Sequence, residues 1–182
     1  MTSSIRAAIS SMENKQKQAK ADFFDRDGTL NVDIHYLHRP QDFIWTEDAQ
    51  EAIRYCNDKG YLVIIVTNQS GVARGYYSEA DIHFLHDWMN KELIKEGAHL
   101  DALYYCPHDK DGRVPAYTMD CDCRKPHPKM VNDACADYNI DKARSFFVGD
   151  TDGDMQCAKN AGVHGLRYKG GSLLQLVAKN VK

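Results

Sequence analysis

The sequence lacks the features that mark a membrane protein or a nucleic-acid binder. No apolar run approaches the roughly 20 residues that a helix needs to cross a bilayer. Basic residues are not in excess either, because 23 Lys and Arg stand against 26 Asp and Glu, for a formal net charge of −3. A nucleic-acid-binding face needs a surplus of Lys and Arg. We therefore expect neither a membrane nor a nucleic acid as a partner.

The N-terminal stretch lacks the apolar core of a signal peptide. MTSSIRAAISSMENKQKQAK contains basic residues but no continuous apolar segment, so export is not expected. We interpret residues 1–20 as a disordered or flexible extension and residues 21–182 as a single domain, monomeric and cytoplasmic. No internal repeat or low-complexity linker divides the chain, and 182 residues with 43% hydrophobic side chains suit one globular core.

Strand and helix patterns alternate from residue 21 onward. Short apolar runs such as YLVIIVT, residues 61–67, are typical of parallel strands buried on both faces. Between them, apolar residues recur at helical spacing, as in the segment that begins at Ser78, where Asp81 completes a capping box. This alternation predicts an α/β fold, a Rossmann-like doubly wound parallel sheet. The expected strands are 21–25, 61–67, 102–106, 145–149 and 165–168, and the expected helices are 46–59, 78–97, 129–139, 153–161 and a last one from 172.

Carboxylates follow two of the expected strands. Asp25 and Asp27 in FFDRDGTLN come after the first, and Asp150 and Asp154 in VGDTDGD come after the fourth. Ligands of such sheets bind beyond the carboxyl ends of the strands. Acids that converge there indicate a hard divalent cation such as Mg²⁺. The alternative is that these aspartates form turns and helix caps, and for Asp154 both interpretations remain open.

The chain is rich in cysteine, and three of its six thiols share one loop with a histidine. Cys106, His108, Cys121 and Cys123 lie within CPHDKDGRVPAYTMDCDC. Three thiolates and one imidazole match a closed, structural tetrahedral Zn²⁺ site. The alternative is a core thiol, a surface histidine and two loop thiols, but exposed neighbouring thiols would oxidise readily. Such a site would anchor the segment that carries Lys125.

Four short motifs resemble those of the haloacid dehalogenase superfamily of aspartate-nucleophile phosphohydrolases. They are DRDGTL, TNQ at residues 67–69, Lys125 and GDTDGD, and they follow one another in the order that the superfamily shows. The resemblance extends over residues 21–168. It implies a Mg²⁺-dependent phosphatase, and the chain has no insertion large enough to form a separate cap domain.

The chemistry of such a site can be argued from the residues. Asp25 is placed to attack phosphorus and form an aspartyl phosphate, which divides a hard displacement into two easier steps. Asp27 can protonate the leaving oxygen and later deprotonate the attacking water. Mg²⁺ would be held by Asp25, Asp150 and the main-chain carbonyl of Asp27, where it offsets negative charge.

Phosphate oxygens need donors besides the metal. Thr67 and Asn68, at the end of the second strand, can donate hydrogen bonds, and Lys125 supplies a fixed positive charge. Without the other motifs, Thr67 and Asn68 would read as ordinary strand-ending residues. Gly28 would let the backbone approach the phosphate, although a plain turn glycine is the alternative.

Within the superfamily, longer segments resemble one group. TNQSGVARGYYSE, YYCPH and CDCRKPHP are similar to phosphatases that remove the 7-phosphate of a heptose 1,7-bisphosphate in nucleotide-activated heptose and lipopolysaccharide biosynthesis. Histidinol-phosphate phosphatases share some of these motifs and are the first alternative. A catalytically inactive phosphate-binding scaffold is the second, and the intact set of Asp25, Asp27, Asp150 and Lys125 weakens it.

A bisphosphate substrate requires a second anion site. Arg74 and Arg124 are the candidates, since a guanidinium group matches phosphate geometry, although Arg74 also suits a solvated loop. His35 and Tyr36 could line the sugar pocket. One position departs from the group: Thr151 stands where these phosphatases often carry Lys, which puts rate and substrate preference in question more than the type of reaction.

Overall fold

The structure is a computed structural model that describes residues 18–181. The expected flexible extension falls almost wholly on residues 1–17, outside this range. Lys20 already belongs to the first strand, one residue earlier than the sequence predicts.

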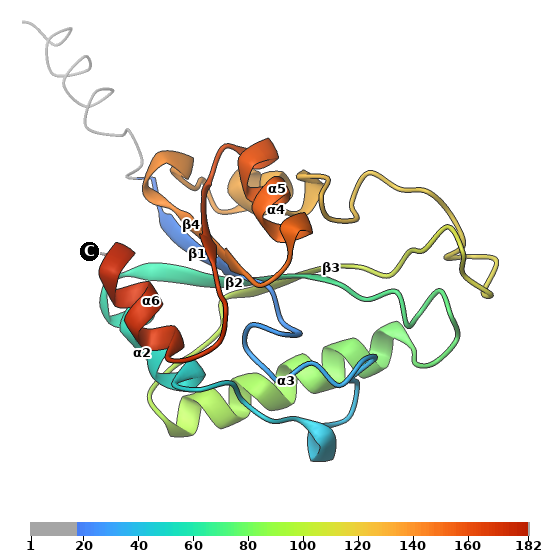
Figure 1. Ribbon diagram of the computed structural model, residues 1–182, viewed down its shortest axis with the longest axis horizontal. Helices are drawn as coiled ribbons and strands as arrows, with labels where there is room; N and C mark the ends of the chain where they lie inside the picture. The colour runs from blue at the N-terminus through green and yellow to red at the C-terminus, as the bar shows by residue number, and fades with distance from the viewer. Residues whose placement is uncertain (1–17, 182) are drawn as a thin grey trace, which may run out of the picture.

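Five parallel strands form one sheet in the order β3-β2-β1-β4-β5, which confirms the predicted doubly wound architecture (Figure 1). All five expected strands are present to within a residue or two at each end. β2 is the longest and carries the continuous β-branched run, whose members are almost all buried. The strands are β1 (Lys20–Phe24), β2 (Tyr61–Asn68), β3 (Ala102–Cys106), β4 (Phe146–Gly149) and β5 (His164–Arg167).

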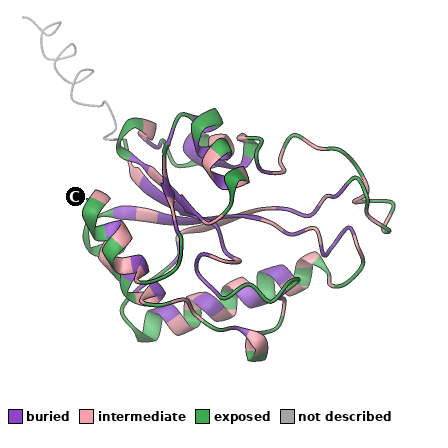
Figure 2. Cartoon of the chain, in the orientation of Figure 1, coloured by how far each residue is buried: buried purple, intermediate pink, exposed green. Residues whose placement is uncertain are grey.

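Helices cover both faces of the sheet (Figure 1). On one face lie α2 (Ala49–Asp58), α3 (Glu79–Lys95) and α6 (Leu173–Asn180), and on the other lie α4 (Lys129–Asp137) and α5 (Asp152–Ala161). Alternate residues of a strand point to opposite faces, so Phe24 and Ile65 join the first core while Phe23 and Ile64 join the second. Figure 2 shows this buried central layer between partly exposed helices.

Local signals set where the helices begin. Ser78 caps α3 in the expected capping box with Asp81, which confirms that prediction. α2 begins at Ala49, three residues later than expected, because Asp48 adopts a left-handed backbone with φ 57°. Two single-turn 3-10 helices, η1 (Pro40–Asp42) and η2 (Lys142–Arg144), were not predicted, since so short a turn shows no periodicity.

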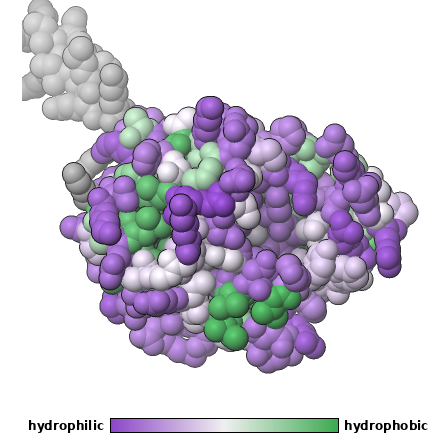
Figure 3. Space-filling view, viewed as in Figure 1, coloured by the Kyte–Doolittle hydropathy of each residue, from purple (hydrophilic) through white to green (hydrophobic). Residues whose placement is uncertain are grey.

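The strand order decides which loops can meet. β1 lies between β2 and β4, so Asp25, the end of β2 at Thr67 and Asn68, and Asp150 lie side by side at one edge of the sheet. This is the edge at which doubly wound sheets bind ligands. None of the helices within residues 18–181 is long and apolar enough to cross a membrane. On the face seen in Figure 3 hydrophilic side chains predominate, and the apolar ones gather in separate patches.

Candidate active site

Three carboxylates and one ammonium group meet at the carboxyl ends of β1 and β4. Oxygens of Asp25, Asp150 and Asp154 lie within 4.8 Å of one another. Lys125 Nζ lies 2.8 Å from Asp25 Oδ1 and 2.7 Å from Asp154 Oδ1, and it donates to the carbonyl of Val66 at 3.0 Å. The three protons of the ammonium group are therefore directed at three oxygens, which fixes Lys125 in place.

One cation does not balance three acids, and the electrostatics reflect it. Burial, followed by the charge of Asp154, raises the pKa of Asp25 to about 7, although Lys125 opposes the shift. Burial and Asp154 also raise the pKa of Asp150. Burial would raise the pKa of Asp154 too, but the charge of Lys125 and hydrogen bonds from Lys125 and Thr151 hold it below its ordinary value. Carboxylate oxygens with unbalanced negative charge are the donor set that suits Mg²⁺.

Gly28 is required by this arrangement. Its backbone has φ +84°, and a Cβ atom there would lie 2.4 Å from Asp150 Oδ2. Any side chain would thus displace the carboxylate of Asp150, in addition to the strain of the left-handed conformation. The structure thus gives Gly28 a reason that the sequence did not predict, its contact with Asp150, and its approach to phosphate stays a prediction.

Asp154 caps a helix and also lies beside Asp25 and Asp150, so its position suits both of the interpretations that the sequence left open. It accepts hydrogen bonds from the main chain and hydroxyl of Thr151 in a capping box at the start of α5. Its other oxygen pairs with Lys125 and joins the acid cluster. Thr151 has a local reason as well, because threonine can cap a helix through its hydroxyl and lysine cannot.

Asp27 lies beside the acid cluster but is bound differently. Its carboxylate accepts hydrogen bonds from Arg26 at 2.9 Å, Asn31 at 3.1 Å and Gln69 at 3.0 Å. It does not belong to the group of three carboxylates, which is consistent with a role for its main-chain carbonyl at the metal. Asp25 and Asp27 line the same cavity of about 140 Å³, at the mouth of the sheet.

Thr67 and Asn68 also line this cavity. The hydroxyl of Thr67 is buried and accepts a hydrogen bond from Gln69 Nε2 at 2.9 Å. The side-chain amide of Asn68 pairs with the main chain of Lys125, accepting from its N–H at 3.0 Å and donating to its carbonyl at 3.2 Å. Asn68 therefore holds the Lys125 segment in addition to facing the cavity.

Two larger hollows adjoin the 140 Å³ cavity, which we call the reaction cavity, and share residues with it. The larger of the two, about 460 Å³, is lined by the basic side chains Arg74, Lys110, Arg124 and Lys125 and by the acidic ones Asp109, Asp111 and Asp120. We call it the basic hollow, because its basic residues outnumber its acidic ones. Arg74 is ion-paired to Asp109 at 2.8 Å. Arg124 donates to the carbonyl of His108 at 3.2 Å and forms no ion pair with any of residues 18–181, although its charge, like that of Arg74, acts on Asp109.

The second hollow, about 240 Å³, opens on the other side of Asp27. His35 and Tyr36 line it, as the sequence suggested, together with Gln69 and Tyr77. His35 and Tyr36 both have a positive φ, 58° and 56°, a backbone conformation that residues other than glycine adopt at an energetic cost. This loop is therefore held by its surroundings rather than by its own preference.

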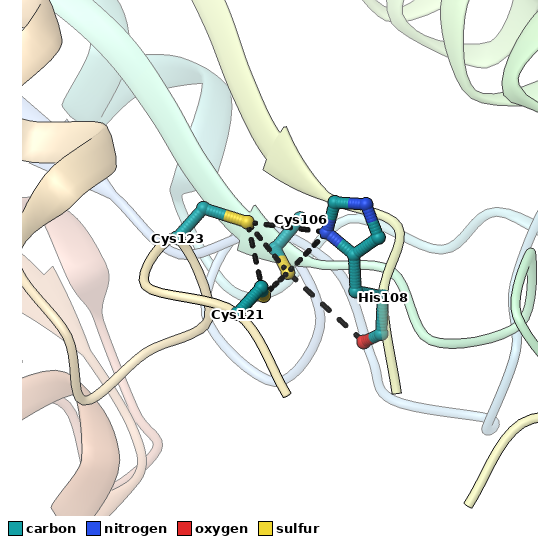
Figure 4. Close-up of side chains that lie close together, drawn as sticks. All are labelled: Cys106, His108, Cys121 and Cys123. Atoms are coloured by element: carbon teal, nitrogen blue, oxygen red, sulfur yellow. Dashed lines mark hydrogen bonds between the residues drawn. The ribbon is translucent and has the colours of Figure 1, made fainter. Parts of the chain in front are cut away.

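The cysteine cluster forms a closed set of ligands (Figure 4). Sulfur atoms of Cys106, Cys121 and Cys123 lie 3.1–3.4 Å apart, and His108 Nδ1 lies 3.4 Å from the sulfur of Cys123. Two sulfurs on a tetrahedral zinc would be about 3.7 Å apart, whereas a disulfide would bring them to about 2 Å. Burial raises the pKa of Cys106 to about 11, so a cation is needed to hold the thiolates. The geometry can hold a structural zinc.

The loop that carries this cluster is joined to the loop after β2. The carbonyl of Ala73 accepts hydrogen bonds from the main chain of Arg113 at 2.7 Å and Val114 at 2.8 Å. At the start of α3, the hydroxyls of Tyr105 and Tyr117 both donate to Glu79. These contacts join the loop that carries the cysteine cluster to the loop that carries Arg74 and to the start of α3.

The structure brings the predicted acids and Lys125 together, and it adds residues that sequence reasoning missed. Asp154 was noted as either a metal ligand or a helix cap, and its ion pair with Lys125 was not predicted. Gln69 lay inside the recognised TNQ motif, which was a usable signal. Arg26 and Tyr77 lie within the recognised segments DRDGTL and TNQSGVARGYYSE, but nothing in their spacing shows that both would bond the amide of Gln69.

Comparison with known proteins agrees with these observations. Residues 20–166 match a family model described as polynucleotide kinase 3 phosphatase. A D-glycero-beta-D-manno-heptose-1,7-bisphosphate 7-phosphatase of Rhodopseudomonas palustris is 44% identical over 82% of this chain and 83% of its own length. A relative from Photorhabdus laumondii, named for the alpha anomer, is 40% identical over 82% and 81%.

Solved structures are similar as well. D,D-heptose 1,7-bisphosphate phosphatase from B. bronchiseptica, complexed with magnesium and phosphate, aligns with a TM-score of 0.75 at 33% identity over 88% of this chain and 86% of that one. A haloacid dehalogenase-like phosphatase from Mesorhizobium loti aligns with a TM-score of 0.79 at 35% identity over 85% and 74%. The chain therefore belongs to the haloacid dehalogenase superfamily, in the family of the D-glycero-D-manno-heptose-1,7-bisphosphate 7-phosphatases.

Proposed function

We propose that this protein is a Mg²⁺-dependent phosphatase that removes the 7-phosphate of D-glycero-D-manno-heptose 1,7-bisphosphate, a step in the biosynthesis of nucleotide-activated heptose and lipopolysaccharide. The observation that carries the proposal is the cluster of Asp25, Asp150, Asp154 and Lys125 beside the basic hollow. The relatives' names supply the substrate. They include both anomers, so the chain is expected to act on a sugar bisphosphate of one or the other anomer.

In the first step, a carboxylate oxygen of Asp25 attacks the phosphorus of the 7-phosphate. The bond from phosphorus to the sugar oxygen breaks, and Asp27 gives its proton to that oxygen. In the second step, Asp27 takes a proton from water as the water oxygen attacks the phosphorus of the aspartyl phosphate. Asp25 and inorganic phosphate are then released. Two separate acids are needed because one carboxylate cannot bind phosphorus and carry the proton.

The other residues of the cavity stabilise charge. Lys125 is fixed beside Asp25, and the hydroxyl of Thr67 faces the same cavity. Asp25, Asp150 and the main-chain carbonyl of Asp27 would hold Mg²⁺. When bound, Mg²⁺ would offset the repulsion between Asp25 and the phosphoryl oxygens.

We assign the second phosphate of the substrate to the basic hollow. Arg124 is the main candidate, because it forms no ion pair within the described part of the chain, whereas Asp109 already offsets the charge of Arg74. His35 and Tyr36 would face the sugar from the other hollow.

The substrate assignment is tested by phosphate release from both anomers of the bisphosphate, from heptose 7-phosphate and from histidinol phosphate. Arg124→Ala should raise KM for the bisphosphate by about 10-fold or more and change KM for the 7-monophosphate little, because only the bisphosphate places an anion there. Faster turnover of histidinol phosphate than of either bisphosphate would reject the assignment. An equal change of KM for both heptose substrates would reject the role of Arg124.

We further propose that the protein acts as a monomer in a reducing cytoplasm. The six thiols are supportive, since none forms a disulfide in the structure. Light scattering of the purified protein would test the monomer, and a mass near twice 20.7 kDa would contradict it.

A further inference from the structure

The carboxylate of Asp27 is surrounded by donors on both of its oxygens. Oδ1 accepts from Asn31 and Arg26, and Oδ2 accepts from Arg26 and Gln69. Arg26, Asn31 and Gln69 are all buried, whereas the side chain of Asp27 is 23% exposed toward the cavity. The direction of this carboxylate is therefore determined by side chains behind it.

Gln69 connects Asp27 to a second group of the cavity. Its Nε2 donates one proton to Asp27 Oδ2 at 3.0 Å and the other to Thr67 Oγ1 at 2.9 Å. Because Thr67 accepts this bond, its own hydroxyl proton remains directed elsewhere, toward the cavity that it lines. One amide group thus orients two residues that face the phosphate.

The orientation of the Gln69 amide is fixed by chemistry. Its Oε1 accepts from Arg26 Nη2 at 3.3 Å and from the hydroxyl of Tyr77 at 2.6 Å. Arginine can only donate, so the amide oxygen must face Arg26, and the amide nitrogen is then turned toward Asp27. A reversed amide would place N–H against N–H and oxygen against oxygen.

Tyr77 is in turn held by packing. Its ring stacks on His38 with centroids 5.0 Å apart. Gly71 leaves room for it, because a Cβ atom at Gly71 would lie 2.1 Å from a ring carbon of Tyr77. Burial raises the pKa of Tyr77 to about 12, so its hydroxyl keeps its proton and remains a donor.

We propose that Gln69 and Tyr77 are positioning residues: Tyr77 holds the Gln69 amide, and Gln69 aims the carboxylate of Asp27 at the leaving oxygen. This inference rests on the proposed role of Asp27 as the proton donor. It assigns a function to the loop between β2 and α3 that is distinct from binding the second phosphate.

The proposal has a consequence that depends on the leaving group. A sugar alkoxide needs a proton as the bond to phosphorus breaks, whereas p-nitrophenolate leaves without one. A misaimed Asp27 should therefore slow the sugar substrate selectively. The parameter to compare is kcat/KM, because it reports the steps up to release of the first product and excludes hydrolysis of the aspartyl phosphate.

The experiment compares four variants of the full chain with heptose 1,7-bisphosphate and p-nitrophenyl phosphate. Tyr77→Phe removes only the hydroxyl, and Gln69→Leu removes the whole connection. Asp27→Asn is the reference for loss of the acid. Tyr76→Phe is the matched control, since the neighbouring Tyr76 is 48% exposed and its ring contacts Tyr36. Thermal unfolding confirms that each variant is folded.

We expect Tyr77→Phe to lower kcat/KM for the bisphosphate by about 10-fold and Gln69→Leu by about 100-fold, within the 10²–10⁴-fold that a proton donor contributes. With p-nitrophenyl phosphate, Tyr77→Phe should change kcat/KM less than about 2-fold. Tyr76→Phe should leave kcat/KM unchanged with both substrates. Gln69→Leu also removes the hydrogen bond to Thr67, so it should lower kcat/KM for both substrates. The loss with the bisphosphate should exceed the loss with p-nitrophenyl phosphate by about 10-fold or more.

Other results overturn the inference in distinguishable ways. If Asp27→Asn is selective for the sugar substrate but Tyr77→Phe and Gln69→Leu are not, the positioning role is wrong and the proposed mechanism survives. Because Gln69 and Tyr77 also line the hollow assigned to the sugar, Tyr77→Phe is repeated in the Asp27→Asn protein. A loss with the bisphosphate that persists there is a direct sugar contact and overturns the inference. If Asp27→Asn itself slows both substrates equally, Asp27 is not the donor, and the inference fails together with that part of the mechanism. If Gln69→Leu does not fold, Tyr77→Phe alone decides.

Discussion

The acid cluster and the cysteine cluster both suit a divalent ion, but they are built in opposite ways. Asp25 and Asp150 follow strands of the sheet, and Asp154 lies in the first turn of α5, so hydrogen bonds of the regular elements set their positions. Of the cysteine cluster only Cys106 belongs to a strand, and the other ligands lie in the loop between β3 and α4.

This difference predicts what each ion does. The sheet forms the acid cluster whether or not Mg²⁺ is present, so its loss should affect catalysis and leave the fold intact. The loop of the cysteine cluster has no regular elements to hold it, and it is too long and polar to keep a shape alone. Loss of zinc should therefore disorder this loop first and reduce activity as a consequence.

The largest effect is expected at the nucleophile. Asp25→Asn should lower kcat by ~10⁴-fold or more, because the amide cannot form the aspartyl phosphate. Lys125 keeps its bond to Asp154, and one buried carboxylate is removed, so the melting temperature should stay equal or rise. Steady-state kinetics and calorimetry measure the two. Activity within 10-fold of the original protein would exclude Asp25 as the nucleophile.

A substitution in the cysteine cluster should affect the stability of the protein more strongly and its activity less strongly than Asp25→Asn does. Cys123→Ser should lower zinc from about one ion per chain and reduce the melting temperature by about 5 °C or more. Activity should fall by roughly 10-fold, because Arg124 and Lys125 follow directly after the cluster. Elemental analysis and thermal unfolding are the measurements. Full stability without bound metal would remove the contrast between the two regions.

The buried acid Asp22 gives a further comparison with the acid cluster. It lies on β1, the strand that leads to Asp25, but no cation is paired with it among residues 18–181. Burial raises its pKa from 3.8 to about 7, while a hydrogen bond from Cys56 at 3.1 Å opposes the shift. Between these values the unfolded chain releases the proton and the folded chain keeps it. Rising pH therefore favours the unfolded state, and the free energy of unfolding falls by on the order of 4 kcal/mol from pH 4 to pH 7.

Asp22→Asn cannot titrate and should lack this decrease. Urea unfolding of both proteins at pH 4.5, 6 and 8 gives the difference in unfolding free energy at each pH, in which the contributions of other groups cancel. The variant should gain relative to the original protein as pH rises. A difference that does not change with pH would show that Asp22 titrates normally in the folded protein.

The smallest effect is expected where the cysteine loop meets α3. Glu79→Gln removes one acceptor for the hydroxyls of Tyr105 and Tyr117 and should destabilise the protein by about 1 kcal/mol or less. Zinc content should not change, because the loop depends on the metal and not on this contact. Loss of zinc in this variant would show that α3 shares in forming the site.

Much of the fold follows from local patterns. The run YLVIIVT predicts a buried strand and Ser78 predicts the start of a helix, and both elements are found where the sequence predicts them. The start of α2 was predicted wrongly, because Thr46 and Glu47 look helical while the chain turns at Asp48 to place α2 against the sheet. Backbone turns of this kind depend on what the helix packs against, and not on the residues before it.

The sequence by itself determined the type of fold, the acids at the strand ends and the set of three cysteines and one histidine. These are properties of residue type and spacing, which short-range physics can interpret. Only the tertiary structure decided that Asp154 both caps α5 and pairs with Lys125, that Asp109 holds Arg74, and that Gln69 and Tyr77 lie behind Asp27. Such contacts join loops that are distant along the chain, and they exist only because the strand order places those loops at one edge of the sheet.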